Sequence, residues 1–244
     1  MSVERLQEHR RLWARKPVLS RVDEPWFDAL LEEAPRGARV LEVGAGPGFL
    51  SARARVRRKD LLWTASDLHP APWNSLAADA GRLPVADGSV GAVVGLDVLH
   101  HLERPAEFLG EAARVLRKGG RLALVEPWIT PLSWVVYRFF HQESCRLSVD
   151  PWHPFPPGKD SFDGDAAVPW RLVRQTLPDR WRALGLDPPR VRRLNAFAYL
   201  LSLGFRPGSL LPAPLAPAAM GIDRLTSPLA PLAALRAKLV WDRA

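Results

Sequence analysis

Three glycines at alternate positions follow a short apolar run in the first third of the chain. The run Arg39–Val43 predicts a buried strand, and Gly44, Gly46 and Gly48 come next, before a segment with helical character. Glycine lets the backbone turn sharply and approach a ligand without a Cβ clash. The exposed N–H groups where a helix begins favour a polar or anionic ligand group. We therefore expect a ligand-binding turn here, although its spacing differs from the Gly-x-Gly-x-x-Gly fingerprint of dinucleotide sites.

A carboxylate ends the second predicted strand. The run Leu61–Ser66 leads directly into Asp67, which lies roughly 20 residues beyond Gly48. A carboxylate at that distance, at the tip of the second strand, can accept hydrogen bonds from ribose hydroxyls. This predicts that the nucleoside part of a ligand binds near Asp67.

The elements that must position these residues alternate between short β-rich runs and helical segments. This pattern indicates βαβ units and a parallel sheet. Lys118, Gly119 and Gly120 are expected to end a helix before the next strand. The predicted strands are Arg39–Val43, Leu61–Ser66, Ala92–Leu96 and Arg121–Glu126, with weaker candidates at Val191–Leu194 and Lys238–Trp241. The predicted helices are Phe49–Arg58, roughly Ala106–Leu116, and Arg171–Leu184, with further helical signals in residues 1–37.

Five motifs follow one another in register over about residues 38–127. They read VLEVGAGPGFL, SDLHP, DAGRLPVADGSV, GLDVLHHL and RVLRKGGRL. This series resembles class I S-adenosylmethionine-dependent methyltransferases of the small-molecule, methyltransferase type 11-like kind, which include quinone-biosynthesis C-methyltransferases. The resemblance implies a Rossmann-like α/β sheet of about seven strands with helices on both faces, an antiparallel last strand and a lid insertion. One departure is Gly91, where the family usually has an aspartate.

The resemblance also implies S-adenosylmethionine as cofactor and a role for each matched residue. The methionine part of the cofactor would be bracketed by Glu42, Gly44, Gly46 and Gly48, and Asp97 would lie near its amine. The ribose would be bound by Asp67. The adenine would pack on Leu68, and its edge would contact Asp79 and the Ala80 N–H. Structural alternatives stay open for the acidic residues. Glu42 could be a buried charge tied to a backbone amide, Asp67 or Asp97 a helix N-cap, and Asp79 a turn residue.

Methyl transfer from a sulfonium is an in-line displacement, so a protein mainly supplies proximity and desolvation. A general base is needed only if the nucleophile must lose a proton. The candidate bases lie after the fourth strand, and we expect His141 or Glu143 near the transferring methyl, with Asp150 and His153 close by in sequence. Two histidines and two acids could also hold a metal ion, but they form no compact ligand motif, so no metal site is expected.

Residues 128–170 are rich in aromatic side chains and look like an irregular insertion. Aromatic groups at a cofactor site can line an apolar pocket and stabilise a sulfonium. We expect Trp128 and Tyr137, with His100 and His101, to line the pocket of a small, apolar or aromatic acceptor. The alternatives are ordinary lid core for the aromatic residues, and packing or capping where a helix begins for the two histidines.

The chain of 244 residues fits a single methyltransferase domain, 1–244. Its zones are N-terminal helices (1–37), the cofactor-binding core (38–127), the lid insertion (128–170) and the C-terminal part of the fold (171–244). A formal net charge of +8 is compatible with nucleic acid. Its basic residues are scattered, however, and the fourth motif lacks the Asn/Asp-Pro-Pro-Tyr/Phe of base-amine methyltransferases. A nucleic-acid partner is therefore not expected, and an RNA methyltransferase or a non-catalytic S-adenosylmethionine-binding protein remain the alternatives.

The single cysteine, Cys145, cannot form an internal disulfide or a cysteine-based metal cluster, which suggests a reducing, cytoplasmic setting. No apolar run is long enough for a transmembrane helix. The proline-broken segment Leu210–Leu235 is expected to pack in the core or lid. The oligomeric state is left open by the sequence.

Overall fold

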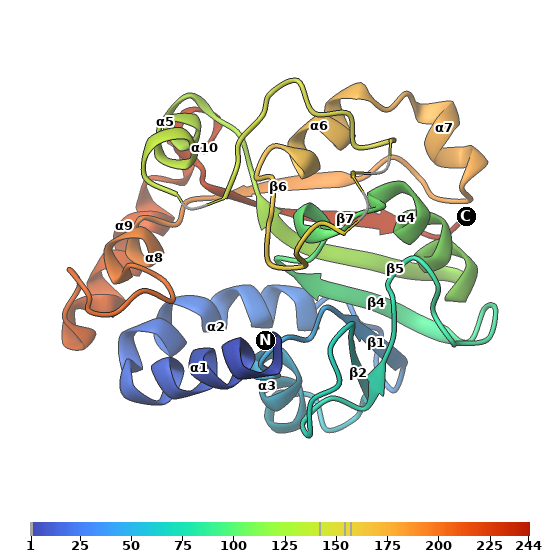
Figure 1. The fold of residues 1–244 in the computed structure, drawn as a ribbon, viewed down its shortest axis with the longest axis horizontal. Helices are drawn as coiled ribbons and strands as arrows, with labels where there is room; N and C mark the ends of the chain where they lie inside the picture. Colours follow the sequence, from blue (N-terminus) through green and yellow to red (C-terminus); the bar gives the residue numbers. More distant parts are fainter. Residues whose placement is uncertain (1, 142, 154, 157) are drawn as a thin grey trace.

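The computed structural model describes residues 2–141, 143–153, 155–156 and 158–244, and it is built on one seven-stranded sheet (Figure 1). The strand order is β3-β2-β1-β4-β5-β7-β6; β1 to β5 are parallel, and β7 runs antiparallel to both β5 and β6. The strands are β1 (Arg39–Val43), β2 (Leu62–Asp67), β3 (Leu76–Ala77), β4 (Val90–Leu96), β5 (Leu116–Pro127), β6 (Arg190–Leu194) and β7 (Arg236–Asp242). The expected fold class and the antiparallel last strand are confirmed.

Helices cover both faces of this sheet. Strand β1 shows why: Leu41 packs in a core with α4, α6 and α7, whereas Val40 packs on the opposite face with α2 and α3. Strands covered on both faces read as continuous apolar runs, which is how the sequence revealed them. The helices are α1 (Ser2–Arg15), α2 (Pro17–Leu31), α3 (Phe49–Arg57), α4 (Pro105–Val115), α5 (Pro131–Phe139), α6 (Val168–Gln175), α7 (Pro178–Ala183), α8 (Phe197–Ser202), α9 (Ala216–Leu225) and α10 (Ala230–Ala233), with 3-10 turns η1 (Leu99–His101), η2 (Ala213–Leu215) and η3 (Ser227–Leu229).

Several predicted elements differ from the structure. The single helix predicted for Arg171–Leu184 is wrong: α6 ends at Gln175 and α7 begins at Pro178, because a residue that precedes proline disfavours helical backbone. Lys118–Gly120 does not end a helix. Helix α4 already ends at Val115, and the tripeptide lies within β5, where Gly119 has a φ of 71°.

Two other segments also depart from expectation. The insertion is not wholly irregular, since α5 lies within it and begins with a capping box between Thr130 and Ser133. The segment Leu210–Leu235 packs in a core only in part: Leu211, Ala216 and Leu235 are buried in core clusters, whereas Leu210, Leu225 and Leu232 have exposed fractions of 70%, 81% and 60%. No helix in the described ranges combines the length and apolar character needed to cross a bilayer.

The unusual Gly91 has a packing reason. Strands β1 and β4 are neighbours, and a Cβ at position 91 would lie 2.9 Å from the Cβ of Ala38. A side chain at that position would force the neighbouring backbone to move. The carboxyl ends of β1, β2, β4 and β5 all meet at one edge of the sheet, where ligands bind in open α/β folds.

Candidate active site

The glycine-rich turn joins β1 to α3 at the carboxyl edge of the sheet. Gly44, Gly46 and Gly48 all have positive φ angles, 65°, 50° and 79°, which L side chains rarely adopt. A Cβ at Gly44 would lie 2.5 Å from Cγ2 of Val98, so that glycine is required by close packing against the end of β4. A Cβ at Gly46 would be in ordinary van der Waals contact with the Gly44 carbonyl oxygen and with Cδ2 of Leu6, each at 3.9 Å.

Asp67 faces this turn from the end of β2. Its Oδ2 atom accepts a hydrogen bond of 2.7 Å from the Gly46 backbone N–H, and its Oδ1 atom accepts one of 2.9 Å from the N–H of His69. The carboxylate is buried and therefore fixes the two loops relative to each other. Leu68, the next residue, is 54% exposed, which is unusual for leucine next to a buried strand. Asp67 does not act as a helix N-cap here, because the residues after it form no helix.

Trp73 and α1 cover the glycine-rich turn, which the sequence did not reveal. The indole Nε1 of Trp73 donates a hydrogen bond to the Gly46 carbonyl oxygen at 2.7 Å, and the indole occupies the space that a Cβ at Gly48 would enter. Arg10 of α1 donates to the Pro47 carbonyl oxygen at 2.6 Å and stacks over Trp73 at 4.5 Å from the ring centroid. The only signal in the sequence was the apolar pattern of residues 1–37.

Glu42 and Asp79 make local contacts. The Oε2 atom of Glu42 accepts a hydrogen bond of 2.8 Å from the Trp63 indole, and burial of this carboxyl raises its pKa to about 8. Glu42 is therefore a buried carboxyl tied to an indole rather than to a backbone amide. Asp79 is exposed, and its Oδ1 atom accepts from the Gly81 N–H at 2.8 Å, as a turn residue does; Ala80 beside it is buried.

Asp97, after β4, pairs with Arg236 at the start of β7. Asp97 adopts a left-handed φ of 54°, and η1 is preceded by Val98 at its N-cap, so Asp97 does not cap it. The Arg236 guanidinium is buried and lies 4.3 Å from the Trp26 ring centroid. Sequence reasoning missed Arg236 because 139 residues separate it from its partner.

Glu126, fully buried at the end of β5, fixes the orientation of η1. Its Oε1 atom accepts hydrogen bonds from the backbone N–H groups of Val98 and Leu99 at 2.9 and 2.8 Å, and its Oε2 atom lies 2.6 Å from Nδ1 of His100. All three donors come from the segment just after β4. The His100 ring is therefore held with its Nε2 atom pointing away from Glu126. Glu126 was placed in the fourth strand, but its role was not foreseen.

Glu143 brings three histidines together, and we call His100, His101, His141 and Glu143 the histidine–glutamate cluster. The Oε2 atom of Glu143 lies 3.3 Å from Nε2 of His100 and 3.8 Å from Nδ1 of His141, and its Oε1 atom lies 3.5 Å from Nε2 of His101. The structure thus unites the two residues expected to be catalytic with the two histidines expected to line the pocket.

The pKa values of the residues in the histidine–glutamate cluster are shifted in different directions. Burial alone lowers the pKa of His100, but the carboxylates of Glu126 and Glu143 outweigh it and raise the value to about 10. Burial and the nearby His100 charge lower the pKa of His101 to about 3. Burial also lowers the pKa of His141. The pKa of Glu143 is lowered because contacts with the histidines, His100 first, outweigh its burial. In neutral solution His141 is therefore uncharged and Glu143 is a carboxylate.

Trp128 and Tyr137 are buried in the core below the insertion, and the Tyr137 hydroxyl donates to the Leu235 carbonyl oxygen. The Tyr137 ring meets the edge of the His141 ring at a centroid distance of 5.3 Å. Tyr137 therefore packs against His141, whereas Trp128 is a core residue. Asp150 and His153 are exposed and pair with each other at 2.7 Å.

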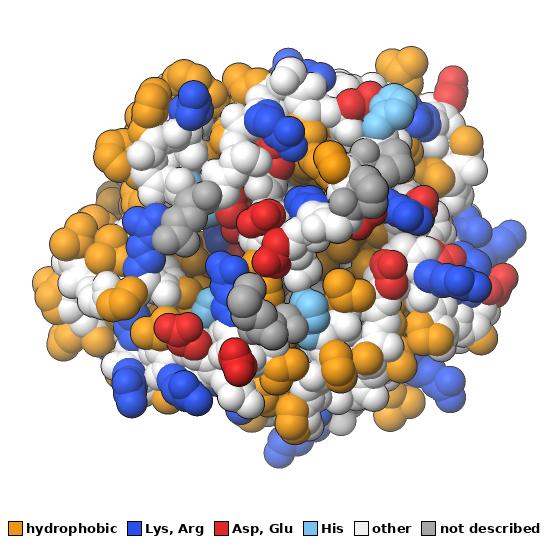
Figure 2. Space-filling model, in the orientation of Figure 1, with side chains coloured by type: hydrophobic (Ala, Val, Ile, Leu, Met, Phe, Trp, Pro, Cys, Tyr) orange, Lys and Arg blue, Asp and Glu red, His pale blue; other side chains and the backbone are white. Residues whose placement is uncertain are grey.

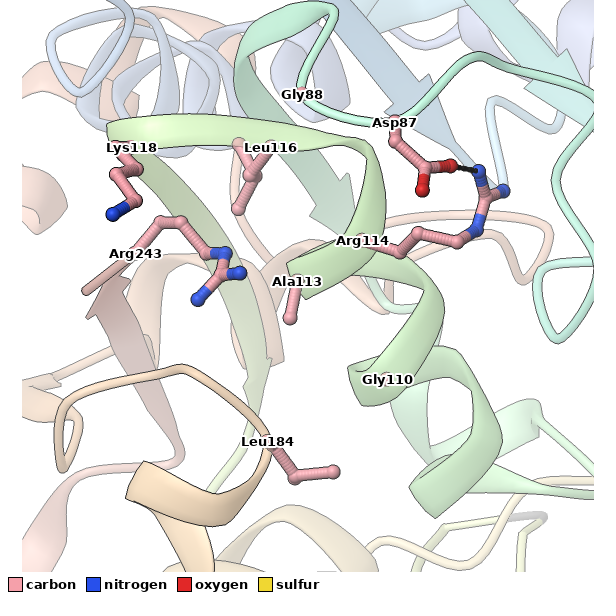
Figure 3. Close-up of a pocket in the computed structure, with 9 residues that line it drawn as sticks. All are labelled: Asp87, Gly88, Gly110, Ala113, Arg114, Leu116, Lys118, Leu184 and Arg243. Carbon is pink, nitrogen blue, oxygen red and sulfur yellow. Dashed lines mark hydrogen bonds and ion pairs between the residues drawn. The ribbon is translucent and has the colours of Figure 1, made fainter.

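Two of the hollows on the described surface help to locate the site. One of about 510 Å³ lies between α4, α7 and the start of β5, and Figure 3 shows its Arg114 turned toward Asp87. That hollow is at the opposite end of β5 from Glu126. The other, of about 410 Å³, is lined by residues 144–165 of the insertion, including Lys159, whose Nζ atom donates to the His101 carbonyl oxygen at 2.8 Å. The second hollow therefore adjoins the histidine–glutamate cluster.

Comparisons with known proteins agree with this architecture. The methyltransferase domain family matches residues 30–124. An uncharacterised methyltransferase of Mycobacterium sp. (strain JLS) is 34% identical over 118 residues, 43% of this chain and 45% of that protein. The tRNA (carboxymethyluridine(34)-5-O)-methyltransferase ALKBH8 of Mus musculus is 33% identical over 166 residues, 62% of this chain and 23% of that protein. The chain thus spans about half the length, or less, of these curated relatives.

Solved structures share the fold. Geranyl diphosphate C-methyltransferase of Streptomyces coelicolor A3(2) superposes with a TM-score of 0.55 at 14% identity, over 91% of this chain and 79% of that chain. A geranyl diphosphate methyltransferase solved with S-adenosylmethionine has a TM-score of 0.56 at 17% identity, over 97% and 90%. Together with the glycine-rich turn and the sheet order, the domain match over residues 30–124 supports a class I S-adenosylmethionine-dependent methyltransferase, and the solved structures share its fold.

Proposed function

We propose that this protein transfers a methyl group from S-adenosylmethionine to a small, apolar or aromatic acceptor by in-line displacement. The observation that carries this proposal is the hydrogen bond from Gly46 to Asp67, which sets a glycine-rich turn and a buried carboxylate side by side at the carboxyl edge of the sheet. His100 and His101 of the histidine–glutamate cluster follow β4 at the same edge, and Glu143 meets them from the insertion. A cofactor turn and a set of titratable side chains are thus neighbours.

The residues present fit this cofactor. Gly46 carries no side chain that would keep a ligand from its backbone, and the charged oxygens of Asp67 can accept ribose hydroxyls. The exposed Leu68 side chain offers an apolar surface to the adenine, and we assign Asp79 and the Ala80 N–H to its polar edge. When bound, S-adenosylmethionine supplies a methyl group already activated by the positive sulfonium.

The insertion, residues 128–170, acts in this proposal as a lid that excludes water. Its hydrogen bonds reach two distant parts of the carboxyl edge: Ser161 contacts His69 at 2.7 Å, and Lys159 donates to the His101 carbonyl oxygen. Phe162 stacks near His69 at a centroid distance of 5.9 Å. Aromatic cover of this kind suits an apolar acceptor, and exclusion of water strengthens every charge interaction in the site.

His141 is the proton acceptor that we propose for an acceptor group that must ionise. Its lowered pKa keeps the ring uncharged in neutral solution, as a base requires. The Glu143 backbone N–H donates to Nδ1 of His141 at 3.3 Å, which orients the ring and marks Nδ1 as the unprotonated nitrogen, the atom that takes a proton. The Glu143 carboxylate, 3.8 Å from that ring, stabilises the charge that then forms.

The test compares His141→Ala with His153→Ala, a second histidine of the insertion that is paired only with exposed Asp150 among the described residues. Acceptors are screened from phenols, quinones and prenylated compounds. We expect His141→Ala to bind S-adenosylhomocysteine normally and to turn over roughly 10²-fold more slowly, the scale of a general base, and His153→Ala to match wild type. Equal turnover in all three proteins removes His141 from the mechanism. No turnover of any acceptor, despite cofactor binding, favours a non-catalytic binding protein.

RNA is the second candidate acceptor, because the net charge is +8 and the mouse relative is a tRNA methyltransferase. Figure 2 shows Lys and Arg side chains spread over this face and interleaved with acidic groups rather than gathered in one stripe. A nucleic-acid site is normally a clustered basic surface. A mobility shift with bulk tRNA at physiological salt decides: a stable complex favours RNA, and no shift leaves the small acceptor.

A further inference from the structure

Two imidazoles and one carboxylate meet within the histidine–glutamate cluster. We propose that His100, His101 and Glu143 form a binding site for a divalent first-row cation of the zinc type. One ligand atom from each residue lies within 4.8 Å of the others. This inference concerns a bound ion, and it stands whether or not the methyl-transfer proposal is correct.

The two oxygens of Glu143 each lie beside one imidazole nitrogen, at distances longer than those of strong hydrogen bonds. Nε2 of His100 lies 3.3 Å from Oε2 of Glu143, and Nε2 of His101 lies 3.5 Å from Oε1. Zinc binds imidazole nitrogen and carboxylate oxygen at about 2.0–2.2 Å in a tetrahedron, so its ligand atoms lie roughly 3.4 Å apart. Charge-assisted hydrogen bonds between nitrogen and oxygen are shorter, at about 2.7–2.9 Å.

Glu126 provides an internal comparison. It contacts the same imidazole, that of His100, at 2.6 Å, as a carboxylate does when it shares a proton directly with a ring nitrogen. Glu143 stands further off on the other side of the ring. Its Oε2 atom is buried and has no hydrogen-bond partner among the described residues. The oxygen is held only by the longer contacts with His100 at 3.3 Å and His141 at 3.8 Å, and a cation between Glu143 and the two imidazoles would bind it more closely.

The surroundings of His100 are those of a metal-bound histidine. Such a histidine usually donates its second ring N–H to a carboxylate, which fixes the tautomer and strengthens the ligand. Glu126 accepts from Nδ1 of His100 and is itself held by the Val98 and Leu99 N–H groups. The Nε2 atom of His100 is thereby presented to the side where Glu143 lies.

The neighbouring group Asp97, His100 and Glu126 is also compact, but its carboxylates are occupied. Asp97 pairs with Arg236, and both oxygens of Glu126 accept N–H donors. Of these two groups, and within the described part of the chain, the one with Glu143 has a buried oxygen that accepts no hydrogen bond of normal geometry. Two imidazoles with one carboxylate suit zinc rather than magnesium, which prefers a sphere of oxygen ligands. Three protein ligands leave a fourth position for water or a substrate oxygen or sulfur.

This site could not be predicted from the sequence, because the two histidines follow β4 whereas Glu143 comes from the insertion beyond β5. The proposed site also lies near a hollow of the insertion. Lys159, which lines this 410 Å³ hollow, donates a hydrogen bond to the carbonyl oxygen of His101. One hydrogen bond therefore joins the backbone of the proposed site to the lining of this hollow.

The experiment measures Zn²⁺ binding to the full chain after removal of any affinity tag and dialysis against a chelator. Titration calorimetry with Zn²⁺ alone is run on wild type, His101→Ala, Glu143→Gln and the control His153→Ala. The two ligand positions are partly exposed, so these variants are expected to fold, which circular dichroism checks. We expect one Zn²⁺ per chain, a loss of roughly 10- to 100-fold or more in affinity in each ligand variant, and no change in His153→Ala.

A second measurement identifies the geometry. Co²⁺ in place of Zn²⁺ should give the intense visible absorption of a four-coordinate site in wild type, and this absorption should be lost in Glu143→Gln. Zn²⁺ binding that is weak, above one ion per chain or equal in all four proteins overturns the proposal and indicates adventitious surface binding only. A six-coordinate Co²⁺ spectrum likewise overturns the zinc-type assignment. Cofactor binding measured on the same samples reports separately on the proposed function.

Discussion

Substitution of Asp67 tests the cofactor site directly, because its carboxylate accepts hydrogen bonds from two backbone N–H groups. In Asp67→Asn one oxygen becomes an NH₂ group, which then faces either the Gly46 N–H, now 2.7 Å away, or the His69 N–H, now 2.9 Å away. One donor loses its acceptor, and the charge that would receive the ribose hydroxyls disappears. A hydrogen bond to a charged group contributes about 1.5–3 kcal/mol, which corresponds to a roughly 10- to 150-fold weaker affinity.

The assay is titration calorimetry with S-adenosylhomocysteine, accompanied by urea unfolding of each protein. The matched control is Asp179→Asn, the same substitution at an exposed site on α7 whose partner is Arg182. We expect Asp67→Asn to lose affinity and the control to keep it. If Asp67→Asn lowers the free energy of unfolding yet binds within twofold of wild type, the carboxylate only ties two loops together. The cofactor site would then have to be placed elsewhere.

Three other predictions concern the frame of the site. Gly44→Ala should destabilise the protein more than Gly88→Ala, because both glycines have positive φ but only the Cβ at position 44 would clash, at 2.5 Å from Val98. The midpoints of urea unfolding of the two variants measure this difference, and an equal decrease of both midpoints would contradict it. Glu126→Gln should lower the free energy of unfolding by about 3 kcal/mol or more, because one of the three buried N–H donors then faces an amide NH₂ group. A decrease under ~1 kcal/mol would show that the hydrogen bonds around residue 126 rearrange to accommodate the amide. Burial raises the pKa of Glu42 from 4.5 to about 8, so the stability that its protonated form contributes below pH 4.5 is lost as the pH rises to about 8. The stability of cofactor-free Glu42→Gln relative to wild type should therefore grow over that range by at least ~1 kcal/mol, whereas a constant difference would show that Glu42 ionises freely.

The fold class could be read from the sequence because it depends on local patterns. Strand β1 was predicted with its observed bounds, since a buried parallel strand is a continuous apolar run that ends at the glycine-rich turn. The two-residue β3 was missed, because it is too short to show any periodicity. The helix predicted across Thr176 and Leu177 failed for a local reason that the sequence did contain, the proline that follows.

Some residues of the candidate site could also be predicted from the sequence, whereas their contacts could not. The glycines and Asp67 could be assigned from the chain itself, since strand, turn and acidic residue recur at a spacing that the βαβ unit dictates. That Asp67 contacts Gly46 directly followed only from the parallel pairing of β1 with β2. Trp73, which closes the turn, carries no sequence signal because its contacts are made by a loop and by α1.

The sequence by itself determined the sheet, the glycine-rich turn and the identity of the titratable residues. Only the tertiary structure decided which of them meet. His100 and His101 follow β4, Glu126 ends β5 and Glu143 lies in the insertion, and these segments come together because parallel strands bring their carboxyl ends to one edge. Arg236 meets Asp97 because β7 returns antiparallel to β5. Burial then sets the charge of each group, and burial is a property of the packed fold rather than of the residues' order in the chain.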